Sequence, residues 1–286
     1  MLGNCDVSDS PELRVLLWNV EGLATVLELG AGCYLEKFSC FIFVETFRTV
    51  NTTISGFYTF ESLAVKPKTG RGRPSLGILM GIKPELKPRL VYKSDFCIGV
   101  VTCAFNLIGG YFPPDIDSDV LTVEISEAIS SFDMTLPTII GGDFNARLDI
   151  ANEKFDLLSE MLADCGFQTI NAASEHTYFG PNGKSTIDLF FTNRTGFSCN
   201  LDCSGLAALR KHAPTVLTGY IPAPQVGEVS ASLRRKRLVV SEALTDGKIR
   251  DIESLLHNRV AEDAYDALVE LINSRLCSNS GGFGQK

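Results

Sequence analysis

The stretch Thr138–Ala146, with the sequence TIIGGDFNA, constrains the fold of this chain more than any other segment. Its apolar run follows Pro137 and ends in two glycines, which is typical of a short buried strand. Glycines at the end of a strand let the backbone turn sharply or let another group approach closely. Because side chains alternate along a strand, Asp143 and Asn145 should point the same way while Phe144 points into the core.

A carboxylate and a carboxamide that share one strand end are suited to hold a metal-bound water or a phosphate. An Asx-rich turn after a core strand explains the same pattern and is the commoner case. This stretch by itself therefore leaves both explanations open, and the rest of the chain has to decide between them.

The composition favours one large globular domain with an appendage. The chain has 286 residues, 45% of them apolar, and its mean hydropathy is +0.12. No apolar run reaches the roughly 20 residues that span a bilayer, so we expect no membrane association. Residues 1–11 are polar and lack the pattern of a signal peptide, so we expect an intracellular protein.

The nine cysteines lack paired CxxC spacing. Several occupy apolar runs, among them Cys40, Cys97 and Cys103, and we expect buried thiols rather than a zinc site or disulfides. Cys199 and Cys203 form the one close pair, but no further ligand follows at the spacing of a zinc finger.

The net charge of −8 is distributed unevenly. Eight basic residues and one acidic residue lie between Ser62 and Ser94. Within this segment, residues 66–74 form a basic loop marked by glycine and proline, and Lys68, Arg71 and Arg73 are predicted phosphate contacts if the substrate is a nucleic acid. A solvated basic face is an equally ordinary explanation.

Two further apolar runs each end in a polar side chain that could bind a metal ion. Residues 13–18 lead to Asn19, and residues 40–44 lead to Glu45. Between them, residues 23–37 are predicted to form a helix, interrupted by glycines. Either strand end alone is explained by a polar residue meeting water, but together with Asp143 and Asn145 they suggest a shared site.

The remaining elements follow from the same patterns. Strands are predicted near residues 56–60, 75–82, 96–104 and 106–110, and helices at 118–132 and 153–165. Tyr111 precedes a Pro-Pro pair, which would hold it at a rigid strand end. Its hydroxyl could donate to a phosphate oxygen, although an ordinary core aromatic fits equally well.

Asp188 lies in an apolar run, and its carboxylate needs a partner because leaving it unpaired would be costly. We expect a hairpin from His176 to Thr192 with Asp188 buried in its returning strand. The next histidine along the chain is His212, and an Asp that orients a His can hold the imidazole as a cation beside an anionic transition state.

The ordered motifs WN, ET, YxPP, GGDFNA, STID and HxP resemble the endonuclease/exonuclease/phosphatase superfamily. They are most similar to the endonuclease domain of LINE-type, non-LTR retrotransposon proteins. The resemblance covers residues 12–221 and implies a two-sheet β-sandwich flanked by helices, in four layers. It also implies an enzyme that nicks DNA, and a partner reverse transcriptase module or element RNA.

The resemblance assigns roles to individual positions. It makes Glu45 and Asn19 ligands of Mg²⁺ or Mn²⁺, an assignment that suits their oxygen atoms. It makes Asp143, Asn145, Asp188, His212 and Tyr111 the catalytic group. Substrate contacts would come from Thr177, Ser185 and Arg147 together with the basic loop.

One position departs from the family pattern, in which an Asp immediately precedes the final His. Here that residue is Lys211. A cation at this position would repel a metal ion, so we expect impaired or altered activity. An inactive nucleic-acid-binding remnant and another phosphoesterase, acting on abasic DNA, RNA or a small phosphoester, remain the alternatives.

The predicted domain is flanked by segments of different composition. Residues 1–11 are a polar tail, residues 222–240 a linker with the basic cluster RRKR, and residues 241–286 a helical appendage. The resemblance makes this end a connector to a reverse transcriptase. The basic cluster favours a nuclear location or a nucleic-acid contact.

Overall fold

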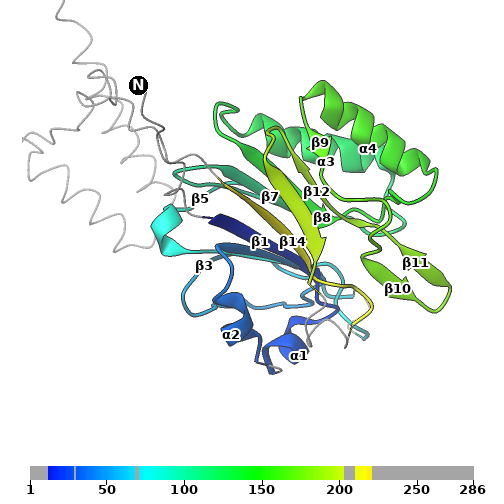
Figure 1. The fold of residues 1–286 in the computed structure, drawn as a ribbon. Helices are drawn as coiled ribbons and strands as arrows, with labels where there is room; N and C mark the ends of the chain where they lie inside the picture. Colours follow the sequence, from blue (N-terminus) through cyan, green and yellow to red (C-terminus); the bar gives the residue numbers. More distant parts are fainter. Residues whose placement is uncertain (1–11, 29, 68–70, 203–209, 221–286) are drawn as a thin grey trace, which may run out of the picture. The chain divides into compact units, whose positions relative to one another are not determined.

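The computed structural model of the chain describes residues 12–28, 30–67, 71–202 and 210–220. The predicted tail (1–11), linker (222–240) and helical appendage (241–286) lie outside the described residues, as does Lys68. Most of the domain predicted over residues 12–221 is described, and Figure 1 labels its helices and strands.

Six strands form the first sheet, in the order β13-β14-β1-β2-β4-β3. They are β1 (Glu12–Asn19), β2 (Cys40–Val44), β3 (Tyr58–Ser62), β4 (Ile78–Ile82), β13 (Phe197–Leu201) and β14 (Thr215–Tyr220). Strands β1 and β2 run parallel, whereas β14 pairs with β1 in the antiparallel sense.

The second sheet also has six strands, in the order β5-β6-β7-β8-β12-β9. They are β5 (Arg89–Lys93), β6 (Cys97–Val101), β7 (Asn106–Tyr111), β8 (Thr138–Asp143), β9 (Gln168–Thr169) and β12 (Asp188–Thr192). It repeats the arrangement of the first sheet, because β7 and β8 are parallel and β12 pairs antiparallel with β8. A separate short hairpin joins β10 (Tyr178–Gly180) to β11 (Gly183–Ser185).

Helices cover the outer face of each sheet, as Figure 1 shows. Helices α3 (Ser118–Ser130) and α4 (Glu153–Asp164) pack on the second sheet, and α1 (Leu23–Glu28) and α2 (Ala31–Leu35) pack on the first. The predicted two-sheet sandwich in four layers is therefore confirmed. No helix in the described part of the chain is long and apolar enough to cross a membrane.

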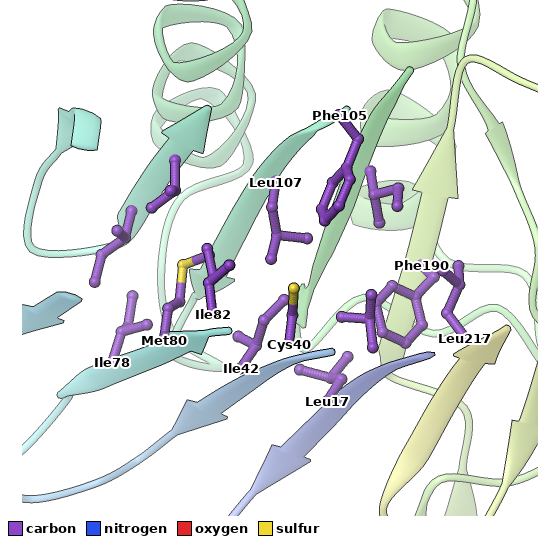
Figure 2. Close-up of a cluster of buried hydrophobic side chains, with 14 of the residues drawn as sticks. Leu17, Cys40, Ile42, Ile78, Met80, Ile82, Phe105, Leu107, Phe190 and Leu217 are labelled. Atoms are coloured by element: carbon purple, nitrogen blue, oxygen red, sulfur yellow. The ribbon is translucent and has the colours of Figure 1, made fainter. Parts of the chain in front are cut away.

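The alternation of side chains along each strand separates three apolar clusters. In β1, Val15 and Leu17 point between the sheets, while Leu16 and Trp18 point toward α1 and α2. Figure 2 shows the cluster between the sheets, where Ile42 and Met80 of the first sheet face Leu107 and Phe190 of the second. Strands buried on both faces read as nearly continuous apolar runs, which is why the sequence revealed them.

The topology brings distant parts of the sequence to one edge of the sandwich. Parallel neighbours end at the same edge, so β1 and β2 end together, as do β7 and β8. Strand β12 starts at that edge, because Asp188 pairs with Asp143, and β14 starts there too, because Thr215 pairs with Leu17. The polar residues at these strand ends therefore converge.

Some sequence predictions were wrong in detail. The helix expected over residues 23–37 is two short helices, separated at Gly30, which has a left-handed φ of 84°. The expected long hairpin ends at Ser185, and β12 belongs to the second sheet, so Asp188 does not lie in a returning hairpin strand. Only two residues, Thr186 and Ile187, separate β11 from β12 along the chain, and no local sequence signal marks this change of sheet.

The glycines of the central stretch also differ from expectation. Gly141 and Gly142 lie inside β8 and make no turn. A Cβ added at Gly142 would lie 2.3 Å from the Gly110 carbonyl oxygen, so the group that approaches closely is the neighbouring strand β7. The expectation of buried thiols holds for Cys40 and Cys97, whereas Cys103 is exposed.

Candidate active site

A cavity of about 360 Å³ opens where these strand ends meet. Its wall is mainly polar and comes from both sheets and from the loops that follow them. The lining residues are Asn19, Glu21, Glu45, Tyr111, Pro114, Asp143, Asn145, Arg147, Tyr178, Ser185, Ile187, Lys211 and His212. Eight of the residues predicted from the sequence are therefore brought together: Asn19, Glu45, Tyr111, Asp143, Asn145, Arg147, Ser185 and His212.

Asp143 lies at the centre of the buried part of this cavity and is 1% exposed. Its Oδ2 accepts a hydrogen bond of 2.9 Å from Asn19 Nδ2, and its Oδ1 accepts one of 3.1 Å from the Asn145 backbone N–H. Burial is the main cause that raises the Asp143 pKa, and the nearby Asp188 carboxylate is the second. His212 lowers it in part, and the net effect is a rise from 3.8 to about 7. A carboxyl group with a pKa near neutrality can exchange a proton under physiological conditions.

His212 and Asp188 form a buried ion pair. His212 Nδ1 lies 2.9 Å from Asp188 Oδ2 and 3.2 Å from Oδ1, and the two residues are 5% and 1% exposed. Burial lowers the His212 pKa, but Asp188, with help from Asp143 and Glu21, outweighs it and raises this pKa from 6.5 to about 9. A pKa raised in this direction favours the protonated imidazole at neutral pH.

Asp143, Asp188 and His212 also have the composition of a metal site, with ligand atoms within 4.8 Å of one another. We interpret them as an ion-pair network instead. Both oxygens of Asp188 face the same His212 nitrogen at hydrogen-bond distance, and an imidazolium carries protons on both nitrogens and has no lone pair for a metal.

The His212 imidazole is held from several sides. Trp18 Nε1 donates to the His212 carbonyl oxygen at 2.9 Å, which fixes the backbone before β14. The Tyr178 ring packs against the imidazole with centroids 4.8 Å apart. These contacts leave the ring little freedom to turn away from Asp188.

Thr177 lies behind the site and does not line the cavity. Its fully buried hydroxyl oxygen accepts hydrogen bonds from the backbone N–H groups of Ile187 and Asp188, at 3.1 and 3.0 Å. Its backbone N–H also donates to the Ser185 carbonyl at 2.9 Å. Thr177 therefore positions the start of β12, whereas Ser185 reaches the cavity wall.

Glu45 and Tyr111 join the two sheets on the other side of the cavity. The Tyr111 hydroxyl donates to Glu45 Oε1, which orients the carboxylate. Burial and this bond to Glu45 raise the Tyr111 pKa, so the phenol stays protonated and remains a donor. Asn145 Nδ2 donates to the Phe112 carbonyl at 2.9 Å, which ties the end of β8 to the residue after β7.

Three residues that follow strand ends have left-handed φ angles without being glycine. These are Glu21 (43°), Glu45 (51°) and Asn145 (48°), after β1, β2 and β8. Such conformations are unfavourable for residues with a Cβ and concentrate at functional sites. Here they turn three polar side chains from the strand ends into the same cavity.

Sequence reasoning missed Glu21 as a site residue. The alternation argument that joined Asp143 to Asn145 also applies to Asn19 and Glu21, two positions apart, and would have found it. Lys211 Nζ lies 3.5 Å from Glu21 Oε1, and the Lys211 backbone N–H donates to Glu21 Oε2 at 3.2 Å. The residue that departs from the family pattern is therefore paired with a carboxylate in the cavity wall.

Of the predicted basic contacts in the described residues, two lie at the cavity or bonded to its wall. Arg147 lines the cavity, but its guanidinium is bonded to Asp149 at 2.6 Å and to the Lys184 carbonyl at 3.1 Å. Arg73 is exposed; it donates to the Glu21 carbonyl at 3.1 Å and stacks over Phe47 at 3.5 Å. Arg71 is exposed and does not line the cavity.

The donor atoms near Glu45 fit a hard divalent cation. The cavity offers the carboxylates of Glu21, Glu45 and Asp143 and the amide oxygen of Asn19, with no thiol among its lining residues. Oxygen donors of this kind suit Mg²⁺ or Mn²⁺ better than zinc. Asn19 Oδ1 accepts from the Glu21 backbone N–H at 3.1 Å, and its second lone pair can still bind a metal.

Comparison with known proteins gave consistent results. Residues 105–215 match a protein family described as endonuclease-reverse transcriptase. The endonuclease domain of TRAS1, a telomere-specific non-LTR retrotransposon, superposes with a TM-score of 0.56 at 19% identity, covering 74% of this chain and 99% of that one. An AP endonuclease from Archaeoglobus fulgidus gives a TM-score of 0.58 at 14% identity, covering 72% and 99%. No curated protein matches the chain.

At these identities the superpositions establish the fold, and the family match adds the sequence of residues 105–215, which includes β7, β8, β12 and His212. Together they confirm the resemblance of this chain to the endonuclease/exonuclease/phosphatase superfamily and, within it, to the endonucleases of non-LTR retrotransposons.

Proposed function

We propose that the chain is a divalent-metal-dependent phosphodiesterase that nicks DNA, of the kind that supplies the target-site nick for reverse transcription in a retrotransposon. The observation that carries the proposal is the position of Asp143. Its carboxylate lies between the Asn19 amide and the buried Asp188–His212 ion pair, in the same cavity as Glu45.

Asp143 is the group that takes the proton from the attacking water. Hydrogen bonds from Asn19 and from the Asn145 backbone fix both carboxylate oxygens, and each oxygen keeps a second lone pair for a water molecule. Its raised pKa makes it a stronger base than an ordinary carboxylate while leaving a large part ionised at neutral pH.

His212 stabilises the charge that develops on the phosphoryl oxygens. Because Nδ1 is bonded to Asp188, Nε2 is the nitrogen that can donate to the substrate. The imidazolium lies in a site sheltered from water, where its charge acts more strongly than in bulk solvent. Asn145, also in the wall, would contact the phosphate or the leaving oxygen with the second hydrogen of its Nδ2, whereas the Tyr111 hydroxyl already donates its proton to Glu45 and acts through that carboxylate.

Glu45, with Asn19 beside it, would hold the Mg²⁺ or Mn²⁺ ion, which when bound neutralises negative charge on the phosphate. The Tyr111 hydroxyl keeps the Glu45 carboxylate facing the cavity, so the ligand is oriented before any ion arrives. Asn19 connects this region to the base, since the same side chain bonds Asp143.

DNA is the proposed substrate because Arg147 lines the cavity and the exposed Arg73 bonds the backbone of Glu21 in its wall, while Arg71 is an exposed cation two residues earlier in the chain. Such cations contact backbone phosphates without reading sequence. We further propose that residues 12–221 are the catalytic domain, that Lys68 adds to the phosphate contacts, and that residues 222–286 connect to a reverse transcriptase module or its RNA.

Two alternatives have specific support. The two solved structures superpose almost equally well, so the fold is as compatible with cleavage at abasic sites as with plain nicking. The Glu21–Lys211 pair favours a second alternative, a nucleic-acid-binding remnant that no longer turns over.

The proposal is tested by nicking of supercoiled plasmid with Mg²⁺ or Mn²⁺, with EDTA as the metal-free control. Glu45→Gln and Asp143→Asn remove the proposed ligand and the proposed base, whereas Lys184→Met alters an exposed hairpin residue that does not line the cavity. We expect open-circular product from the wild type and Lys184→Met, and none with EDTA or from the two site variants.

The same assay on an abasic duplex, a single-stranded RNA and a small phosphodiester separates the alternatives. Faster cleavage of the abasic duplex than of the intact one would replace nicking by abasic-site cleavage. Binding of DNA without turnover of any substrate would overturn the enzymatic proposal and favour the remnant.

A further inference from the structure

The cavity contains one ion pair that the proposed mechanism does not use. Lys211 contacts both oxygens of Glu21, with its ammonium 3.5 Å from Oε1 and its backbone N–H 3.2 Å from Oε2. Both residues line the same cavity as Glu45 and Asp143. The pair joins two loops of the first sheet, because Glu21 follows β1 and Lys211 precedes β14.

The backbone on both sides of this pair is well fixed. The Lys211 carbonyl accepts a hydrogen bond of 2.7 Å from the Phe179 N–H, and the next residue, His212, is 5% exposed. On the other side, Glu21 has a left-handed φ of 43°, and its carbonyl accepts from Arg73. The two charges are therefore brought together by the fold and not by chance contact of two free side chains.

The pair is too exposed to contribute much to stability. The Lys211 side chain is 53% exposed and the Glu21 side chain 19% exposed, and pairs of this kind have small net energies. Its effect is on the charge of the cavity. Without Lys211, the carboxylates of Glu21, Glu45 and Asp143 would together form a strongly anionic pocket able to attract more than one divalent cation.

We propose that Lys211 is a built-in counter-cation that occupies Glu21 and thereby limits the cavity to a single divalent ion, held on the Glu45 side. The inference rests on the metal dependence of the proposed function. It replaces the expectation of simple impairment, because the lysine supplies at Glu21 the positive charge that a second ion would bring.

Counting of bound Mn²⁺ by calorimetry and by electron paramagnetic resonance tests this inference without relying on turnover. The proteins compared are the wild type, Lys211→Met, Glu21→Gln, the double variant Glu21→Gln/Lys211→Met, and Glu45→Gln. Lys184→Met is the matched control for loss of one exposed positive charge outside the cavity. Circular dichroism melts confirm that each variant is folded, and Lys211→Gln serves as a second replacement.

We expect one Mn²⁺ per wild-type chain, and binding at least about 10-fold weaker in Glu45→Gln. Lys211→Met and Lys211→Gln should bind a second Mn²⁺, or bind the first at least about 10-fold more tightly, because the Glu21 carboxylate is released. The double variant should return to wild-type binding, since the released carboxylate is then missing. Lys184→Met should match the wild type.

Two Mn²⁺ ions on the wild type, or unchanged binding in both Lys211 variants, would overturn the inference. So would an absence of Mn²⁺ binding in every protein. Plasmid nicking by the same preparations separates this failure from failure of the proposed function. If the wild type nicks plasmid but Mn²⁺ binding is the same in the Lys211 variants, the proposed nuclease function holds and the inference about Lys211 fails. If the wild type binds one Mn²⁺ ion and the Lys211 variants bind more, but the wild type does not nick, the inference holds and the proposed function fails.

Discussion

The two sheets contribute to the site in different ways. The second sheet supplies Tyr111, Asp143 and Asp188 from within its strands, where the backbone ladder fixes each residue: Tyr111 pairs with Asp143, and Asp143 pairs with Asp188. The first sheet supplies Asn19 from the last position of β1, but Glu21, Glu45 and His212 come from loops beyond its strand ends.

We call Asp143, Asp188 and the His212 paired with them the rigid half of the site, and Glu21 and Glu45 the adjustable half. Asp143 and Asp188 are each 1% exposed, and their charges depend on buried partners. Glu45 and Glu21 are half-buried, and their side chains line the open cavity where an ion or a phosphate would enter. The second sheet therefore fixes the proposed base, Asp143, and the carboxylate that orients His212, whereas Glu21 and Glu45 of the first sheet are the more accessible carboxylates.

The largest expected effect on stability comes from removing a carboxylate of the rigid half. Asp188→Ala leaves a buried His212 without its partner, and we expect a loss of about 3–5 kcal/mol in the free energy of unfolding. Urea unfolding at pH 7 measures it. A loss below about 1 kcal/mol would show that the Asp188–His212 ion pair contributes little to the stability of the rigid half.

The dependence of stability on pH should be next in size. The His212 pKa is higher in the folded state, about 9, than its ordinary value of 6.5, so the native state binds more protons in this range. The stabilisation is therefore fully present below pH 6.5 and is lost as the pH rises through about 9, by on the order of 3 kcal/mol.

Unfolding of the wild type and of His212→Gln between pH 7 and 9.5 checks this sign. Groups away from the site titrate alike in both proteins, whereas loss of His212 raises the Asp143 pKa further, so the difference between the two curves reports His212 together with Asp143. Parallel curves would contradict the proposed imidazolium.

A smaller loss of stability is expected from removing the Thr177 hydroxyl, which positions the start of β12 and therefore Asp188. Thr177→Val removes the acceptor for the N–H groups of Ile187 and Asp188, which should cost about 1–3 kcal/mol. Thr177→Ser keeps the hydroxyl and is the matched control, with a loss below that of the valine variant. Equal losses in the two variants would mean that the methyl group, and not the hydroxyl, positions β12.

The smallest stability effect is expected in the adjustable half. Glu45→Gln keeps the shape of the side chain and an acceptor for the Tyr111 hydroxyl, so we expect a change below about 1 kcal/mol, although the same variant abolishes nicking. Thermal melts of this variant beside Asp188→Ala give the comparison directly. Destabilisation of similar size in both would remove the distinction between the two halves.

Much of the fold was predictable because the core strands carry strong local signals. The apolar runs before Asn19, Glu45 and Asp143 mark β1, β2 and β8 with nearly correct ends. The order of the short motifs around them indicated the superfamily. Strand β5 was missed because it lies at a sheet edge, where its side chains are largely exposed and give no apolar run.

The residues of the candidate site could be predicted where they lie at the ends of strands that the sequence reveals. Sequence reasoning brought forward Asp143, Asn145, Glu45 and Asn19 because each follows an apolar run, and it paired Asp188 with His212 from the need to neutralise a buried carboxylate. It missed Glu21, and it gave Thr177 a substrate contact where the structure shows a buried acceptor for backbone groups.

The sequence by itself determined the strands, the polar residues at their ends and the identity of the groups available for chemistry, because these follow from local alternation and from the cost of burying charge. Apart from the Asp188–His212 pair, only the tertiary structure decided which of these groups meet. Tyr111 reaches Glu45 from the other sheet, and Lys211 meets Glu21 across 190 residues of sequence. Contacts at such separations depend on strand order and register, which local patterns do not encode.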